Sequence, residues 1–235
     1  MKALERRPFA IVGHRGAAGL EPENTIKSIK RALEIGVDII EIDVRSTKDG
    51  ALILLHDEDF KRLAGVKLKA RDLLLNEIKE KITIKGEEVA TLEDAISVIN
   101  GKVGLFIEVK EPETTLKIID LIKAYNATSW IAIISFFDEA LITARKLLPD
   151  IITGLIYARP PGRIFEAKKL GANIVLPRYT IATKKANSLA HKLGLYVVAW
   201  TVNDIKVANR LIQSKIDAIA TDYPDKLIKL RASII

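Results

Sequence analysis

Hydrophobic and polar positions change their periodicity regularly along this chain. Short runs of Ile, Val and Leu alternate with longer amphipathic segments, a pattern typical of strand and helix units around a parallel sheet. Eight such units within 235 residues predict an α/β fold, the (β/α)8 TIM barrel. The predicted strands cover residues 9–13, 38–44, 103–109, 130–135, 151–157, 173–177, 195–202 and 217–221. The predicted helices cover residues 25–35, 92–99, 114–125, 138–148, 161–170, 183–193, 204–214 and 225–232.

One apolar run, residues 51–55, breaks the alternation because only a turn separates it from the second strand. The pair Asp49-Gly50 is typical of a two-residue type I′ turn, so we expect a β-hairpin extension in which Lys48 pairs with Ala51. Counting along that ladder places Asp43 opposite His56, on the same face of the sheet. A slip of one residue in this register turns His56 away from that face.

The alternation also stops between about residue 57 and residue 90. A stretch this long inside a compact fold is usually functional or a local subdomain. We therefore predict one domain over residues 1–235, with a small insertion at about 57–90 over one side of the barrel mouth. The alternative fold, a doubly wound open sheet, requires a GxGxxG loop after the first strand, and residues 13–19 lack that spacing.

Carboxylates lie at the carboxyl ends of two predicted strands, where barrel enzymes carry their chemistry. Glu41 and Asp43 are two residues apart, so both side chains point to one face of a strand. Apolar residues fill the alternate positions, which places both carboxylates in a barrel interior, where a positive partner must offset their burial. Glu108 repeats this geometry on the next strand. The three together suit a divalent cation, whereas exposed positions on an edge strand are the alternative.

Two of the three histidines follow predicted strands directly, within clusters of charged residues. His14 precedes Arg15 and Gly16, and His56 precedes Asp57. By itself, the first cluster also fits a turn with exposed basic residues. Because Asn24 or Thr25 can cap the next helix and fold this loop over the strand end, we favour a functional site.

Three further residues are weaker candidates for a site. His191 lies on a predicted helix, so we expect it at the surface. Trp130 begins a strand at the opposite end of the barrel and is assigned to packing. Asp222 lies at a suitable strand end, but the start of the last helix explains it equally well.

Composition narrows the class of protein and its partners. Hydrophobic residues make up 49% of the chain and charged residues 29%, as in ordinary globular proteins. No cysteine is present, so a metal ion must be held by oxygen or imidazole ligands. The net charge is +7, but the Lys and Arg residues are scattered among acidic residues and form no basic run, which argues against a nucleic-acid partner. The lack of a signal peptide and of a membrane span predicts a cytoplasmic protein without a stable membrane anchor. Abundant Lys, Glu and Ile with a single Met is a thermophile-like composition.

The order of the motifs resembles that of the glycerophosphodiester phosphodiesterase family, which belongs to the phospholipase C-like phosphodiesterase superfamily, across nearly the whole chain. The matching segments are His14-Arg15-Gly16, Glu23-Asn24-Thr25, Glu41-Ile42-Asp43-Val44, His56-Asp57, Glu108-Val109-Lys110 and Trp200-Thr201-Val202-Asn203. The segment Lys61-Arg62-Leu63-Ala64-Gly65 departs from the Thr- and Gly-containing stretch usual in that family.

This resemblance implies the hydrolysis of a small glycerophosphodiester to glycerol phosphate and an alcohol. It further implies that His14 and His56 form the acid–base pair. Glu41, Asp43 and Glu108 are implied to hold one divalent cation, Mg²⁺, Mn²⁺ or Ca²⁺. Arg15 and Lys110 are implied to meet the phosphate, and Trp200 the carbon side of glycerol.

Two other functions keep most of these motifs. A lysophospholipase D acting on larger lipid head groups differs only at the insertion and loops. A non-catalytic glycerophosphate-binding protein keeps the metal and phosphate ligands, but has little reason to keep both histidines. The sequence leaves open the metal, the preferred alcohol, the stereochemistry of the glycerol phosphate, which histidine is the acid, and the oligomeric state.

Overall fold

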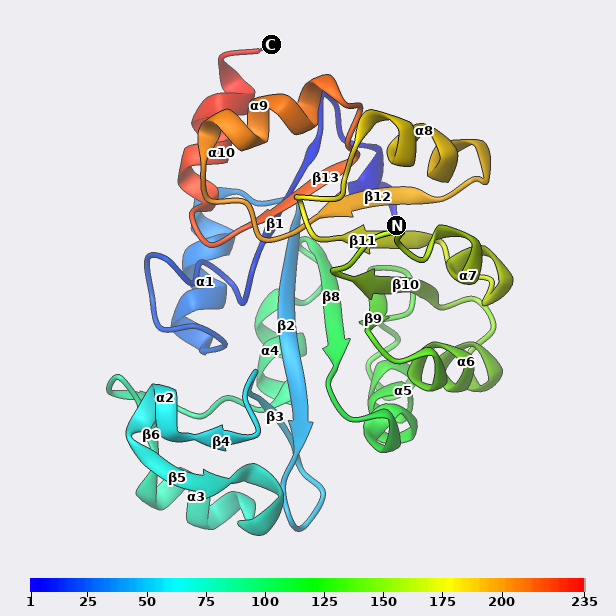
Figure 1. The fold of residues 1–235 in the computed structure, drawn as a ribbon. Coiled ribbons are helices and arrows are strands. Elements are labelled where there is room, and N and C mark those ends of the chain that lie inside the picture. Colours follow the sequence, from blue (N-terminus) through cyan, green and yellow to red (C-terminus); the bar gives the residue numbers. More distant parts are fainter. Residues whose placement is uncertain (235) are drawn as a thin grey trace.

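Eight parallel strands close into a barrel in the computed structural model, which describes residues 1–234 (Figure 1). Closure is direct, because the first strand pairs in parallel with both the second and the last. This confirms the predicted (β/α)8 barrel. The barrel strands in spatial order are β1 (Ala10–Gly13), β2 (Ile39–Ser46), β8 (Gly104–Val109), β9 (Ile131–Ser135), β10 (Ile152–Tyr157), β11 (Ile174–Pro177), β12 (Tyr196–Ala199) and β13 (Ala218–Thr221).

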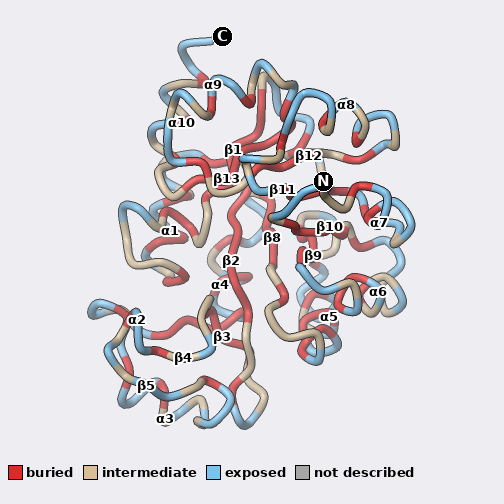
Figure 2. Tube along the Cα trace, in the orientation of Figure 1, coloured by how far each residue is buried: buried red, intermediate tan, exposed pale blue. Residues whose placement is uncertain are grey.

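Helices surround the barrel and bury their apolar faces against it (Figure 2). The predicted helices agree with the observed helices within a few residues, because capping residues in the sequence mark where several helices begin. Thr25 accepts a hydrogen bond from the backbone of Ser28, and Thr91 and Thr183 cap two later helices in the same way. The helices are α1 (Ile26–Ile35), α4 (Leu92–Ile99), α5 (Thr115–Ala124), α6 (Asp138–Leu147), α7 (Ile164–Lys169), α8 (Lys184–Lys192), α9 (Ile205–Gln213) and α10 (Pro224–Ala232).

Alternation along β2 separates two cores. Ile40, Ile42 and Val44 pack into the layer between barrel and helices, whereas Ile39 packs into the barrel interior. The interior is apolar in its lower layers, and the short 3-10 helix η1 (Lys2–Glu5) adds Leu4 to it. Glu41 and Asp43 share the interior face with Ile39, nearer the carboxyl end of the strand. Polar groups are thereby confined to the mouth of the barrel.

The hairpin that follows β2 differs in register from the prediction. In β3 (Leu52–Leu54), Leu54 pairs with Val44 and Leu52 with Ser46. The loop therefore contains residues 48–50 rather than two residues, with Gly50 at a φ of 78°. Three-residue hairpin loops use such a positive-φ glycine, which explains why the Asp-Gly pair did not produce a type I′ turn. Leu55, not His56, lies opposite Asp43.

The predicted insertion is a small lobe beside the hairpin, with a separate cluster of buried residues (Figures 1 and 2). Phe60 and Leu63 bury their side chains there against Ile53 and Leu55 of the hairpin. No helix within residues 1–234 has the length and apolar character needed to cross a membrane. The lobe consists of β4 (Asp59–Phe60), α2 (Lys61–Ala64), β5 (Val66–Lys69), η2 (Ala70–Asp72), α3 (Leu75–Lys81), β6 (Thr83–Ile84) and β7 (Glu87–Glu88).

Candidate active site at the barrel mouth

Three carboxylates converge at the mouth of the barrel. Because β2 and β8 pair in parallel, Asp43 lies beside Glu108, and Glu41 is one interior position below Asp43. One oxygen of each of the three carboxylates lies within 4.8 Å of the other two. Glu41 and Asp43 are almost completely buried, at 4% and 1% exposure. The predicted trio therefore forms one cluster rather than three separate surface charges.

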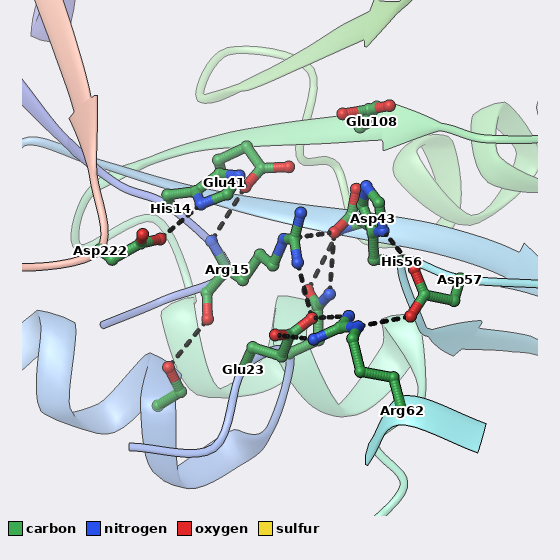
Figure 3. Close-up of polar contacts among 12 residues, drawn as sticks. His14, Arg15, Glu23, Glu41, Asp43, His56, Asp57, Arg62, Glu108 and Asp222 are labelled. Atoms are coloured by element: carbon green, nitrogen blue, oxygen red, sulfur yellow. Dashed lines mark hydrogen bonds and ion pairs between the residues drawn. The ribbon is translucent and has the colours of Figure 1, made fainter. Parts of the chain in front are cut away.

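Two basic side chains and an amide surround the cluster, and Figure 3 shows the first of them, Arg15, beside Asp43. The Arg15 Nε atom lies 3.1 Å from Asp43 Oδ2, and Lys110 Nζ lies 3.3 Å from Asp43 Oδ1. Lys110 also donates to Glu108 Oε1 over 2.6 Å. Asn24 donates its side-chain N–H to Asp43 and accepts the backbone N–H of the same residue. Asp43 is thus the most strongly supported anion of the three.

The pKa values of the carboxylates follow from these surroundings. Burial, together with the negative charge of Asp43, raises the pKa of Glu41 to about 8 and shifts the pKa of Glu108 in the same direction. Burial also opposes ionisation of Asp43, but the positive charges of Lys110 and Arg15 outweigh it and hold the pKa of Asp43 below its ordinary range. The protein by itself therefore compensates one of the three negative charges well and the other two poorly.

A divalent cation fits this deficit. Within residues 1–234, Glu41 Oε1 and Asp43 Oδ1 are buried oxygen atoms that accept no hydrogen bond, although Lys110 Nζ forms an ion pair with the second at 3.3 Å. Buried acceptors without partners are costly, so their presence points to a positive ligand. Carboxylate oxygens are the donors that Mg²⁺, Mn²⁺ and Ca²⁺ prefer. The residues that could hold such an ion are Glu41, Asp43 and Glu108.

His14 lies in the tight turn after β1. A side chain at Gly13 would come within 2.3 Å of the Gly16 carbonyl oxygen, so only glycine allows this turn. The His14 Nδ1 atom is 2.7 Å from Asp222 Oδ1, while its Nε2 atom lies 4.0 Å from Glu41 Oε2. Burial lowers the pKa of His14, but the hydrogen bond with Asp222 and the charge of Glu41 raise it more, so the net shift is upward.

His56 reaches the cluster although the predicted register is wrong. The last backbone hydrogen bond between the hairpin strands joins Leu55 to Asp43, and the chain bends at His56, so the alternation of the strand no longer sets the direction of this side chain. Its Nδ1 atom is 2.7 Å from Asp57 Oδ1 (Figure 3). Burial lowers the pKa of His56 despite the opposing charge of Asp43. Each histidine therefore has an aspartate at Nδ1, which leaves Nε2 free for a substrate.

Both histidines line one cavity of about 160 Å³ together with Glu41, Glu108 and Trp200. Arg15 and Thr201 also line it, and the rest of its wall is apolar, from interior side chains such as Phe106 and Leu176. Trp200 is fixed by a hydrogen bond from Nε1 to the Leu176 carbonyl and by an edge-on contact with Phe136 at 5.6 Å. The cavity thus has an apolar floor and a charged opening.

The remaining candidates lie elsewhere. His191 is 2.7 Å from Asp217, which is at the opposite, amino-terminal end of the barrel strands, and Trp130 packs against the outer core as predicted. Sequence reasoning missed the role of Asp222, because its partner His14 is 208 positions away. It also assigned Asn24 to helix capping, whereas Asn24 binds Asp43. The sequence does contain a signal for this contact. Asn24 and Thr25 are both good capping residues but a helix uses one cap, so the other side chain is available to bind elsewhere.

A closed barrel with a buried acidic cluster and paired imidazoles at its carboxyl-end mouth is a TIM-barrel enzyme. A profile of the glycerophosphoryl diester phosphodiesterase family matches residues 14–226. The chain belongs to this family.

Two relatives and one solved structure show the extent of the likeness. A glycerophosphodiester phosphodiesterase of Caldanaerobacter subterraneus is 34% identical over 94% of this chain and 96% of its own length. The human lysophospholipase D GDPD1 is 30% identical over 92% of this chain and 84% of its own length. The structure of an Oleispira antarctica phosphodiesterase, in complex with the product sn-glycerol-3-phosphate, has a TM-score of 0.88 and 28% identity. It covers 95% of this chain and 96% of the other.

Proposed function

We propose that this protein hydrolyses glycerophosphodiesters to glycerol phosphate and an alcohol, with His14 and His56 as the general acid–base pair and with a divalent cation bound. The observation that carries the proposal is that both imidazoles line a single small cavity together with Glu41 and Glu108 of the acidic cluster. When bound to Glu41, Asp43 and Glu108, the cation supplies Lewis-acid stabilisation of negative charge on the phosphate. The metal identity and the cytoplasmic location stay predictions.

Arg15 and Lys110 are the proposed phosphate ligands. Burial lowers the pKa of each group, but the surrounding carboxylates together raise it more, Asp43 with Glu23 for Arg15 and Asp43 with Glu108 for Lys110, so both stay charged. A phosphodiester carries one negative charge, which must be offset before a nucleophile can approach the phosphorus atom. The fork of Arg15 and the point charge of Lys110 contact different oxygens of Asp43, so they offer the phosphate two separate positive groups.

The two imidazoles are proposed to move the protons. One takes a proton from a glycerol hydroxyl, whose oxygen attacks phosphorus, and the other gives a proton to the departing alcohol, each through Nε2, which leaves a cyclic phosphate. Water then opens the cyclic phosphate to glycerol phosphate, with the two proton transfers reversed. Their environments shift the two pKa values apart, upward for His14 and downward for His56. Near neutral pH this favours one protonated and one neutral ring, which is the state that acid–base catalysis requires.

The substrate preference can be predicted from the size of the cavity. Its volume of about 160 Å³ is well below the roughly 300–1,000 Å³ of pockets that enclose drug-sized ligands. The cavity therefore suits the glycerol phosphate unit but not an added acyl chain. We expect kcat/KM for glycerophosphocholine to exceed that for lysophosphatidylcholine by about tenfold or more, as measured by choline release. A preference for the lysophospholipid would instead support the lysophospholipase D function.

The contact between Asp222 and His14 predicts a pH effect. Asp222 raises the pKa of His14, so in Asp222→Asn the pKa of His14 falls. If activity needs one neutral and one protonated ring, the alkaline limb of the kcat/KM profile moves to lower pH. At pH 8 we expect kcat/KM to fall by roughly tenfold or more, since the ring also loses its orienting partner. A profile with an unmoved alkaline limb contradicts this role.

A further inference from the structure

Arg62 on α2 connects the insertion to the active site. Its guanidinium group donates from Nε to Asp57 Oδ2 over 2.6 Å. Its two terminal nitrogens donate to the two oxygens of Glu23, each over 2.7 Å. Arg62 thus joins carboxylates from two separate loops, Glu23 between β1 and α1 and Asp57 after β3 (Figure 3).

Each of these carboxylates also holds a residue of the site. Asp57 uses its second oxygen for His56 Nδ1, and Glu23 Oε1 accepts a hydrogen bond from Arg15 NH1 at 2.7 Å. Arg62 is therefore one contact removed from a proposed acid–base residue on one side and from a proposed phosphate ligand on the other. A surface ion pair alone contributes little, but a bidentate arginine within a network is the exception.

The side chain of Arg62 takes little part in the packing of the lobe. The neighbouring residues Phe60 and Leu63 are buried in the core of the lobe, whereas the Arg62 side chain is 47% exposed. Gly65 ends the helix with a φ of 74°. These neighbours fix α2, so the Arg62 side chain is available to orient its two partners.

We propose that Arg62 is a positioning residue that orients His56 through Asp57 and Arg15 through Glu23. The inserted lobe thereby supports both sides of the reaction centre. This inference rests on the proposed acid–base role of His56. Its two arms have different kinetic consequences: misplacing His56 lowers kcat, and misplacing Arg15 weakens phosphate binding and raises KM.

The test compares Arg62→Ala, Asp57→Asn and Glu23→Gln with glycerophosphocholine as substrate. We expect Asp57→Asn to lower mainly kcat, Glu23→Gln to raise mainly KM, and Arg62→Ala to do both, by roughly 10-fold to 100-fold in kcat/KM. Adding Asp57→Asn to Arg62→Ala should lower kcat little further, because both changes disrupt one network. Lys61→Ala is the matched control, since this exposed side chain on the same helix takes no part in the network.

Nuclear magnetic resonance of the histidine rings separates positioning from catalysis. The chain has three histidines, so their ring ¹⁵N signals can be assigned by single substitutions. In Arg62→Ala the His56 signals should move or broaden while those of His191 stay fixed, whether or not the protein hydrolyses diesters. An inactive wild-type protein therefore overturns the proposed function, and unchanged His56 signals overturn the positioning role. If Arg62→Ala does not fold, Arg62→Lys replaces it. One ammonium cannot span both carboxylates, so wild-type kinetics in that variant also overturn the proposal.

Discussion

Replacing either His14 or His56 by alanine is expected to lower kcat by about 10² to 10⁴-fold, the usual contribution of a general acid or base. Both rings line the cavity, and each has an aspartate at Nδ1, so neither can substitute for the other. The measurement is release of the alcohol from a glycerophosphodiester at saturating substrate. Removing both rings should cost much less than the product of the two single losses, because they act as a unit.

His191→Ala is the matched control for these variants. It removes the same side chain, but from the opposite end of the barrel, where its partner is Asp217. We expect its activity to equal that of the wild type at temperatures where it stays folded. A loss in His191→Ala as large as in His14→Ala would mean that the effect reflects stability rather than proton transfer. Full activity in His14→Ala or His56→Ala would contradict the acid–base role of that ring, whereas a wild type that releases no alcohol would favour the non-catalytic binding protein.

Replacing Glu41 by glutamine is expected to abolish metal binding and, in the metal-free protein, to increase stability. Glu41 is a buried carboxylate with one unpartnered oxygen, and burial beside Asp43 raises its pKa to about 8. A glutamine oxygen can still accept the Arg15 backbone N–H that Glu41 accepts, and its amide group can donate to the neighbouring carboxylates. In a chelator, we expect the Tm of Glu41→Gln to exceed that of the wild type by about 2 °C or more, roughly the effect of 1 kcal/mol in a chain of this size.

The effects of metal and of pH on stability provide two further tests of this prediction. Adding Mg²⁺, Mn²⁺ or Ca²⁺ should raise the Tm of the wild type but not that of the variant. At a metal concentration of 100 times Kd, the free energy of unfolding of the wild type should increase by about 2.7 kcal/mol. In the metal-free wild type, native Glu41 keeps a proton that the unfolded chain releases above pH 4.5. The free energy of unfolding therefore falls as pH rises from about 4.5 towards 8, and Glu41→Gln lacks this component.

Activity and a distant glutamate complete the comparison. Glu41→Gln should lose about 10²-fold or more in kcat/KM with every metal, as expected when a ligand is lost. Glu34→Gln, on the exposed face of α1, should change neither the response to metal nor the activity. If Glu41→Gln is less stable than the wild type in chelator, the carboxylate cluster is not the source of strain that its burial indicates.

The hairpin is an element whose position the sequence predicts correctly and whose register it does not. The pair Asp49-Gly50 correctly marks a turn, but the local sequence fits both a two-residue and a three-residue loop, and the two registers differ by one residue. The loop is held by contacts outside the hairpin. The Lys48 N–H donates to the Leu73 carbonyl, and Lys117 Nζ donates to the Gly50 carbonyl. Both partners come from distant segments, which no local turn rule includes.

Asp222 and Arg62 show the same limit at the site. Asp222 lies beside His14 only because β13 closes the barrel against β1, so its role depends on closure and not on any local motif. Arg62 looked like a departure from the resemblance, and its bridge to Glu23 exists only because the lobe folds back over the loop after β1.

The sequence by itself determined the barrel, most helix and strand boundaries, and the set of residues that converge at the mouth. Periodicity and capping are local, and parallel strands bring their carboxyl ends to one side whatever the details of the loops. Only the tertiary structure decided which groups pair there: Asp222 with His14, Asn24 with Asp43, and Arg62 with both Asp57 and Glu23. Those pairings depend on distances of a few ångströms between segments far apart in the chain, and the alternation of residues along a strand does not specify them.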